Sequence, residues 1–231
     1  MSNQILVCSL DIVGTVVFAV SGAIVGSQRR LDLFGVLVLA VATATAGGVM
    51  RDVLIGVIPP QPIGNWHILA LTITSGLFAV RFQNSILRLG RLVQLLDSVG
   101  LGVFAVTGTE IALLHEIPPA MAAVLGMVSA IGGGIARDLL TARTPVVLTS
   151  EIYALAALAG GMIVAAGHTV GLTSATTALP GAVACCLLRM TALYRGWSLP
   201  SHAPSKDCLL SRSNRAPSHF NKKEKCNHDI Y

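Results

Sequence analysis

The sequence has very little charge. Asp, Glu, Lys and Arg make up 12% of its 231 residues, whereas soluble domains carry about 25%. Hydrophobic residues make up 53% and the mean hydropathy is +0.72, so a water-soluble fold would have to bury too much apolar surface. The apolar residues come in blocks of about 20, the length that spans a bilayer. The composition therefore excludes an ordinary soluble domain and predicts an integral membrane protein.

Several catalytic and binding motifs are also lacking. The sequence has no Walker A loop, no dinucleotide fingerprint and no G-x-S-x-G segment. Its five cysteines form no C-x-x-C pair, and its six histidines have no metal-ligand spacing. The T-V-G-Y-G filter of pore-loop potassium channels is missing too. We therefore expect no enzyme, no cofactor, no resident metal, no disulfide and no pore-loop channel.

Seven apolar segments have the length and composition of membrane helices. They are rich in Ala, Val, Leu and Gly and lack period-2 alternation, which favours helices over barrel strands and predicts an all-α membrane fold. A polar, basic tail follows from about residue 196, and its composition predicts disorder. The predicted spans are residues 5–27, 33–57, 66–82, 93–114, 118–141, 150–167 and 171–192.

Positive charge is confined to one side of these spans. The amino-terminal segment and the loops after the second, fourth and sixth spans contain no Lys or Arg, whereas the other loops carry arginines and the tail is basic. The positive-inside rule therefore predicts an external amino terminus and a cytoplasmic carboxyl terminus. The net charge of +5 follows from this topology, so no nucleic-acid partner is expected.

The sequence repeats itself at a shift of 86 residues. LDIVGTVVFAVSG (residues 10–22) matches LDSVGLGVFAVTG (96–108), and GGVMRD (47–52) matches GGIARD (133–138) without a gap. Each copy holds three spans, and because three is odd the second copy must enter the membrane from the opposite side, as an inverted repeat. The predicted organisation is a first repeat at 1–86, an inverted second repeat at 87–170, a seventh helix at 171–195 and the basic tail at 196–231.

Glycine clusters lie at matching places in the second and fifth spans. Inverted repeats are typical of proteins that move solutes, with discontinuous helices lining the pathway at the repeat interface. Each Gly costs a helix about 1 kcal/mol relative to Ala, so Gly47-Gly48 and the glycines at 132–134 predict breaks in these two spans. The alternative is that the glycines only allow the helices to pack closely.

Each glycine cluster is followed by an adjacent Arg and Asp. Arg137 obeys the positive-inside rule and could reach the cytoplasmic surface, whereas Arg51 lies near the outer end of its span, where that rule disfavours it. Charges inside a membrane face a bundle interior or an aqueous cavity and pair with other groups. The sequence leaves open whether Arg51 and Arg137 pair with Asp52 and Asp138 within one repeat or between the two.

Two further matched pairs complete the candidate pathway. Asp11 and Asp97 lie near opposite mouths, where carboxylates favour cations, although Asp97 could instead stabilise a helix amino terminus. The hydroxyls of Thr43 and Ser129 lie one turn before the glycines and could replace ion hydration, or bond the carbonyl four residues earlier. The predicted pathway residues are Asp11, Thr43, Gly47, Gly48, Arg51, Asp52, Asp97, Ser129, Gly133, Gly134, Arg137 and Asp138.

The duplicated G-G-x-x-R-D and L-D-x-V-G segments, the three-plus-three-plus-one layout and the external amino terminus resemble the trimeric intracellular cation (TRIC) channel family, in its bacterial and archaeal branch. The resemblance covers about residues 8–200. It implies a homotrimer in the bacterial inner membrane, in contact with lipid. Each subunit would have its own pore for monovalent cations, chiefly K⁺, lined by the second and fifth spans bent at their glycines.

The resemblance also leaves two questions open. In the animal branch Lys-Glu-Val follows the glycines, whereas Arg-Asp stands there in this chain, so lipid regulation of the animal kind is not implied. Bacterial relatives have also been catalogued as possible glycine transporters. The alternative function is therefore secondary transport of a small zwitterion such as glycine, because inverted repeats suit alternating access as well. A non-conducting membrane scaffold is a third hypothesis.

Overall fold

The computed structural model describes residues 2–82, 92–149 and 151–195. Within these ranges every regular element is a helix, which confirms the all-α prediction. The predicted tail at 196–231 lies outside the described residues. The helices are α1 (Ser2–Gln28), α2 (Leu33–Ile55), α3 (Gln61–Gly64), α4 (Trp66–Arg81), α6 (Leu92–Leu114), α7 (Pro119–Leu140), α8 (Val146–Thr149), α9 (Glu151–Thr169) and α10 (Ser174–Arg195).

Each of the seven predicted spans corresponds to one of the longer helices, with ends that agree within a few residues. Six of these helices are long and apolar enough to cross a membrane, so the chain is a multi-pass membrane protein. The remaining one, α4, is apolar but has 16 residues, about 24 Å of helix. Its crossing, and with it the count of seven spans, stays a prediction.

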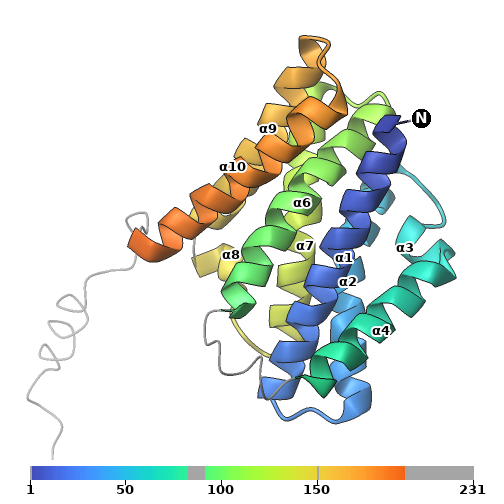
Figure 1. The fold of residues 1–231 in the computed structure, drawn as a ribbon, viewed down its shortest axis with the longest axis vertical. Coiled ribbons are helices and arrows are strands. Elements are labelled where there is room, and N and C mark those ends of the chain that lie inside the picture. The colour runs from blue at the N-terminus through green and yellow to red at the C-terminus, as the bar shows by residue number, and fades with distance from the viewer. Residues whose placement is uncertain (1, 83–91, 150, 196–231) are drawn as a thin grey trace, which may run out of the picture. The chain divides into compact units, whose positions relative to one another are not determined.

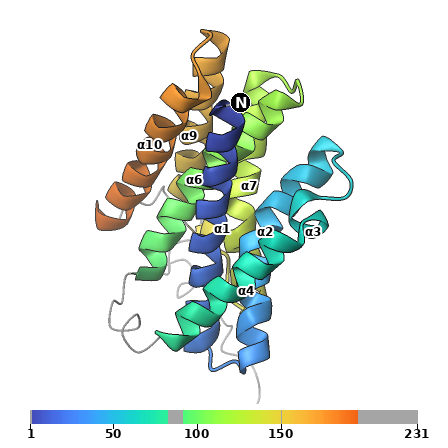
Figure 2. The same ribbon diagram turned by 45° about the vertical axis from the view of Figure 1, so that its right-hand side comes forward.

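The two groups of three helices run in opposite directions. In Figure 1, α1 runs downward from the amino terminus, α2 runs upward and α4 runs downward, whereas α6 runs upward, α7 downward and α9 upward. Figure 2 shows the same directions after a 45° turn. The beginnings of α1 and α6 therefore lie at opposite ends of the helical bundle, and α10 ends at the end opposite the amino terminus.

Matching helices of the two groups pack against each other, α1 on α6 and α2 on α7. Phe18 of α1 and its match Phe104 of α6 are both buried and stack with ring centroids 5.3 Å apart. A Cβ atom at Gly100 would collide with the Phe18 ring, and one at Gly14 would press on Phe104. These contacts are reciprocal, as they are in an isologous interface, where residue i touches j and j touches i.

The predicted breaks at the glycine clusters are wrong, because α2 and α7 run as uninterrupted helices through them. The glycines instead bring the two helix backbones together. A Cβ atom on Gly47 would overlap the carbonyl oxygen of Ser129, and one on Gly133 would overlap the carbonyl oxygen of Thr43. The helices keep their own hydrogen bonds and use the missing side chains for close approach, as small residues do in membrane bundles.

Candidate functional site

The Arg137 network consists of Arg137, Asp138, Asp97 and Ser21. The Nε of Arg137 donates to Asp138 Oδ1 at 3.0 Å. Its Nη1 donates to Asp97 Oδ1 at 2.8 Å and to Ser21 Oγ at 3.0 Å. Asp97 lies on α6 of the same repeat, whereas Ser21 lies on α1 of the other. One buried guanidinium therefore joins three helices through charge-assisted hydrogen bonds, which are stronger than neutral ones.

The Arg51 network contains the matching residues Arg51, Asp52 and Asp11. Asp52 Oδ1 accepts from Arg51 Nε at 2.8 Å and lies 2.8 Å from its Nη2. Asp11, the match of Asp97, has its Oδ1 3.8 Å from Arg51 Nη1, which is an ion pair but not a hydrogen bond. In both networks each arginine therefore pairs with carboxylates of its own repeat, which settles the question that the sequence left open.

Asp52 and Asp138 each accept a further hydrogen bond at their second carboxylate oxygen. Asp52 Oδ2 accepts from the backbone N–H of Gln61 at 2.8 Å, at the first residue of α3. Asp138 Oδ2 accepts from the N–H of Val146 at 3.1 Å, at the first residue of α8. The Asp of each G-G-x-x-R-D segment thus holds its arginine and also anchors the short helix that follows, because a carboxylate can accept at both oxygens.

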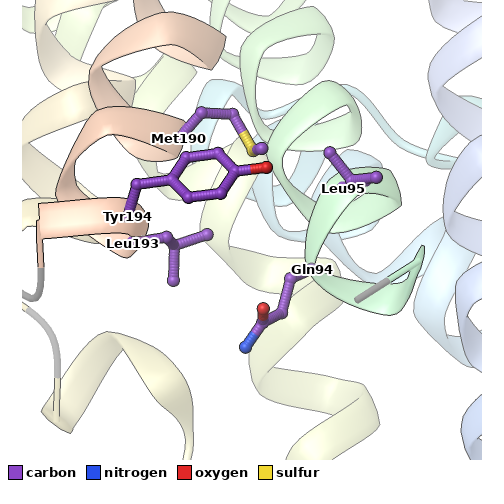
Figure 3. Close-up of a pocket in the computed structure, with 5 residues that line it drawn as sticks. All are labelled: Gln94, Leu95, Met190, Leu193 and Tyr194. Carbon is purple, nitrogen blue, oxygen red and sulfur yellow. The ribbon is translucent and has the colours of Figure 1, made fainter. Parts of the chain in front are cut away.

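Each network lies beside a cavity. The Asp11 cavity measures about 520 Å³ and is lined by Asp11, Thr15 and His67 together with residues of α1, α3, α4 and α6. The Asp97 cavity measures about 400 Å³ and is lined by residues of α1, α6, α7, α8 and α10, among them Asp97 and Arg137. A smaller cavity of about 280 Å³ lies between the start of α6 and the end of α10, where the Tyr194 ring points toward α6 (Figure 3).

The charge balance differs between the two ends. Each network sets two carboxylates against one guanidinium, an excess of one negative charge when all three groups are ionised. The lining of the Asp97 cavity adds Arg143 and Arg189 to its network, so positive charge prevails there, whereas the described lining of the Asp11 cavity holds no Lys or Arg. Acidic groups at a pore mouth favour cations and basic groups oppose them. The Asp11 cavity is therefore the less positive of the two.

The other predicted pathway residues lie in helix contacts. Thr43 Oγ1 donates to the Leu39 carbonyl at 2.6 Å, which is the backbone-bonding alternative raised for this hydroxyl. Ser129 is buried where the α7 backbone meets Gly47. A Cβ atom at Gly48 would meet Pro62 and one at Gly134 would meet the Tyr153 hydroxyl.

Three contributors to the site were missed from the sequence. Ser21 bonds Arg137, and its only signal was its match with Thr107. Arg189 of α10 lies over the Tyr153 ring, with its guanidinium carbon 4.7 Å from the ring centroid, and also lines the Asp97 cavity. The signal for Arg189 was available, because an arginine inside an apolar span is by itself a candidate functional residue. Tyr153 carried no comparable signal.

Comparison with known families adds a second line of argument. Residues 8–84 and 94–169 match the model of a family described as glycine transporter. The two matched segments begin 86 residues apart, the same shift as the internal repeat. The chain is also 36% identical to the UPF0126 inner membrane protein YadS of Escherichia coli K12 over 200 residues, which cover 86% of this chain and 97% of that protein.

Two solved structures have the same fold. The trimeric intracellular cation channel orthologue from Rhodobacter sphaeroides superposes with a TM-score of 0.80 at 33% identity, covering 83% of this chain and 99% of that one. A prokaryotic TRIC channel crystallised in 0.5 M KCl gives a TM-score of 0.76 at 31% identity, covering 85% of this chain and all of that one.

Proposed function

We propose that this chain, which belongs to the TRIC family that the glycine-transporter model describes, is a channel for monovalent cations, chiefly K⁺. The pathway runs between the Asp11 cavity and the Asp97 cavity along α2 and α7, and each protomer of a homotrimer has its own pathway. The amino terminus is external, α4 is the seventh span, and the two groups of three helices form an inverted repeat. The opposite helix directions in Figure 1 support that inversion.

One observation carries the proposal. Two matching networks of buried charge, built on α1, α2, α6 and α7, each border a cavity, and the glycine contact between α2 and α7 lies between the two networks. Buried charge in a membrane is expensive and marks ion or substrate paths. Because each arginine is held by carboxylates, its repulsion of a passing cation is reduced. The negative excess at the Arg51 network, which no further arginine of the described cavity lining offsets, supplies the preference for cations.

Recording from purified protein in planar bilayers tests this function. In symmetric KCl we expect discrete unitary currents. In a KCl gradient we expect a reversal potential closer to the equilibrium potential of K⁺ than to that of Cl⁻. The Asp11→Asn variant should lower the permeability of K⁺ relative to Cl⁻, because it removes the negative excess of the Arg51 network. Asp32→Asn is the matched control, since exposed Asp32 caps α2 outside both networks. Unitary currents without cation selectivity, or absent currents, would contradict the proposal.

A second candidate function is transport of a small zwitterion. Two observations favour it: the description of the matching family, and the close backbone contact of α2 with α7 at Gly47 and Gly133. In alternating access the two repeats move against each other at such a central contact. Saturable counterflow of glycine into proteoliposomes, in the absence of unitary currents, would favour this function over the channel.

A further inference from the structure

We infer that His67 is a specificity-determining residue of the Asp11 cavity, and that its protonation removes the preference of this cavity for cations. While the imidazole is neutral, the two carboxylates and one guanidinium of the Arg51 network leave an excess of one negative charge. A protonated imidazole at the same cavity brings the sum to zero. The inference rests on the proposed pathway, because it concerns the charge at that pathway's external end.

His67 lies at the start of α4, at the same cavity as the carboxylate of Asp11. Its ring lies against the Trp66 ring with centroids 3.9 Å apart, and its backbone N–H donates to Asn65 Oδ1 at 3.1 Å. The residue is nevertheless exposed. The neighbouring residues therefore fix His67 at the cavity, while its ring remains in contact with water and can exchange protons with it.

The helices that pack against α4 are α1, α2 and α3, and they contribute few other charges to this place. Among the described residues, the titratable side chains of α1 are Cys8 and Asp11, and both line the cavity. Those of α2 are Arg51 and Asp52, which pair with each other. The short helix α3 has none, and the other basic residue of α4 lies in its last turn. A proton on His67 therefore adds a positive charge that no fixed basic group of the described cavity lining supplies.

Helix α6 lines the Asp11 cavity with the apolar side chains of Ile111 and Leu114. Its carboxylate at this end, Glu110, accepts from Ser174 Oγ at 2.8 Å, so it faces α10. At the opposite end of the bundle, the described lining of the Asp97 cavity contains no histidine. Histidine protonation therefore changes the charge of the Asp11 cavity and not that of the Asp97 cavity.

The histidines among the described residues all lie toward the end of the bundle that holds the amino terminus. His67 is near the start of α4, His115 follows α6, and His168 is in the last turn of α9 (Figure 1). The connecting segments at this end contain no Lys or Arg. Histidine is the side chain that gains a positive charge between about pH 8 and pH 5. Acid therefore gives this end the basic charge that its loops lack.

The internal repeat places a tyrosine where His67 stands. At the shift of 86 residues His67 matches Tyr153, just as Asp11 matches Asp97. Tyr153 is buried, and a tyrosine cannot take up a positive charge. The fold of a repeat therefore does not require a histidine at this position, and the titratable ring belongs to the external end alone.

Cys8 can report the charge of the cavity directly. It is exposed and free and lines the cavity, and replacing the other native cysteines leaves it as the single thiol. The experiment uses the full chain in detergent and measures how fast Cys8 reacts with a cationic and with an anionic methanethiosulfonate of similar size, at about pH 8 and about pH 5. The ratio of the two rates depends on the charge near the thiol, because the thiolate fraction is common to both reactions.

The ratio of the cationic to the anionic rate should fall about fourfold between these pH values. One added charge in water changes the local concentration of each reagent about twofold, in opposite directions. His67→Gln should keep the high ratio at both pH values, because Gln cannot gain a charge. His67→Lys carries the charge permanently and should keep the low ratio at both.

His115→Gln and His168→Gln are the matched controls, because these histidines lie toward the same end of the bundle but not in the described lining of the cavity. Both variants should show the full fall of the rate ratio. A ratio that does not change with pH in the parent chain overturns the inference. A fall that persists in His67→Gln overturns it too, since another group would then carry the charge.

Recordings in planar bilayers separate this inference from the proposed function, because the reaction of Cys8 does not depend on ion flux. Acid on the external side should lower the permeability of K⁺ relative to Cl⁻ about twofold in the parent and leave it unchanged in His67→Gln. The expected rate ratios in a protein without K⁺ current would refute the proposed function and support the charge assigned to His67. A K⁺ current together with a constant rate ratio would support the function and overturn the inference.

Discussion

The two matching aspartates Asp97 and Asp11 should contribute very differently to stability. Both stand at the same position of the repeat and both face an arginine. Asp97 accepts a hydrogen bond from Arg137 at 2.8 Å, whereas Asp11 lies 3.8 Å from Arg51 without a hydrogen bond. Replacing each by Asn removes one charge and little volume, so the two variants compare one interaction in two geometries within a single protein.

The expected magnitudes follow from burial. Removing one partner of a buried ion pair costs about 3–5 kcal/mol of the free energy of unfolding. Asp97→Asn should cost about 3 kcal/mol, the lower end of this range, because the Asn oxygen can still accept from Arg137. Asp11 makes no hydrogen bond to Arg51, its side chain is 23% exposed, and Arg51 keeps its contact with Asp52, so Asp11→Asn should cost about 1 kcal/mol or less. For a chain of this size 1 kcal/mol corresponds to about 2–4 °C in Tm. Asp97→Asn should therefore lower Tm by about 6–12 °C, and Asp11→Asn by less than about 4 °C.

Thermal melting of the purified variants in one detergent, followed by tryptophan fluorescence or by loss of the monodisperse gel-filtration peak, measures both shifts. Asp32→Asn serves again as the reference, because it removes a carboxylate that caps α2 from outside the networks. If Asp11→Asn and Asp97→Asn lower Tm equally, the difference between 2.8 Å and 3.8 Å has no energetic meaning and the reasoning from these distances is refuted.

Three other predictions concern packing, the tail and topology. Gly47→Ala should destabilise the protein by about 1–3 kcal/mol through overpacking, while Gly64→Ala, whose Cβ atom would only touch Pro59 at 3.5 Å, should melt like the wild type. Deletion after Pro200 should leave the gel-filtration position of the oligomer and its conduction unchanged, and a smaller particle would show that the tail takes part in assembly. A reporter fused after Tyr231 should read cytoplasmic and one at the amino terminus external; both ends on one face would remove the inverted repeat.

Much of the fold follows from the sequence, because membrane helices can be recognised by their composition and length. The segment predicted at 93–114 is α6 at Leu92–Leu114, and the segment at 33–57 is α2 at Leu33–Ile55. The ends of α2 also follow local rules. Asp32 caps its first turn by accepting from the N–H of Gly35, and Gly56 ends it in a left-handed conformation with φ of 89°.

The glycine clusters were misjudged because helix propensity was given more weight than packing. Propensity describes the free-energy cost of Gly in an isolated helix. Inside a bilayer, however, breaking the backbone hydrogen bonds of a helix is far more costly, because no water replaces them. A second helix that fits against the glycines then offsets the penalty. The sequence cannot reveal that fit, because it depends on where Ser129 of one repeat meets Gly47 of the other.

The partners of the arginines also lay beyond the sequence, although every partner except Ser21 was on the candidate list. Asp52 follows Arg51 directly, and side chains of adjacent helical residues point about 100° apart. The pairing requires the long guanidinium to fold back along its own helix, with its remaining edge turned toward α1 and α6. An Arg placed before an Asp can do this and a Lys cannot do it equally well, because the planar guanidinium bonds the neighbouring carboxylate through Nε and still directs Nη1 elsewhere.

The repeated Arg-Asp is therefore one structural unit in which the two residues act together, and not two independent charges. Its Asp fixes the arginine and the next short helix, which leaves Nη1 to face the neighbouring helices. In the second repeat Nη1 of Arg137 bonds Asp97 and Ser21, whereas in the first repeat Nη1 of Arg51 lies 3.8 Å from Asp11 without a hydrogen bond.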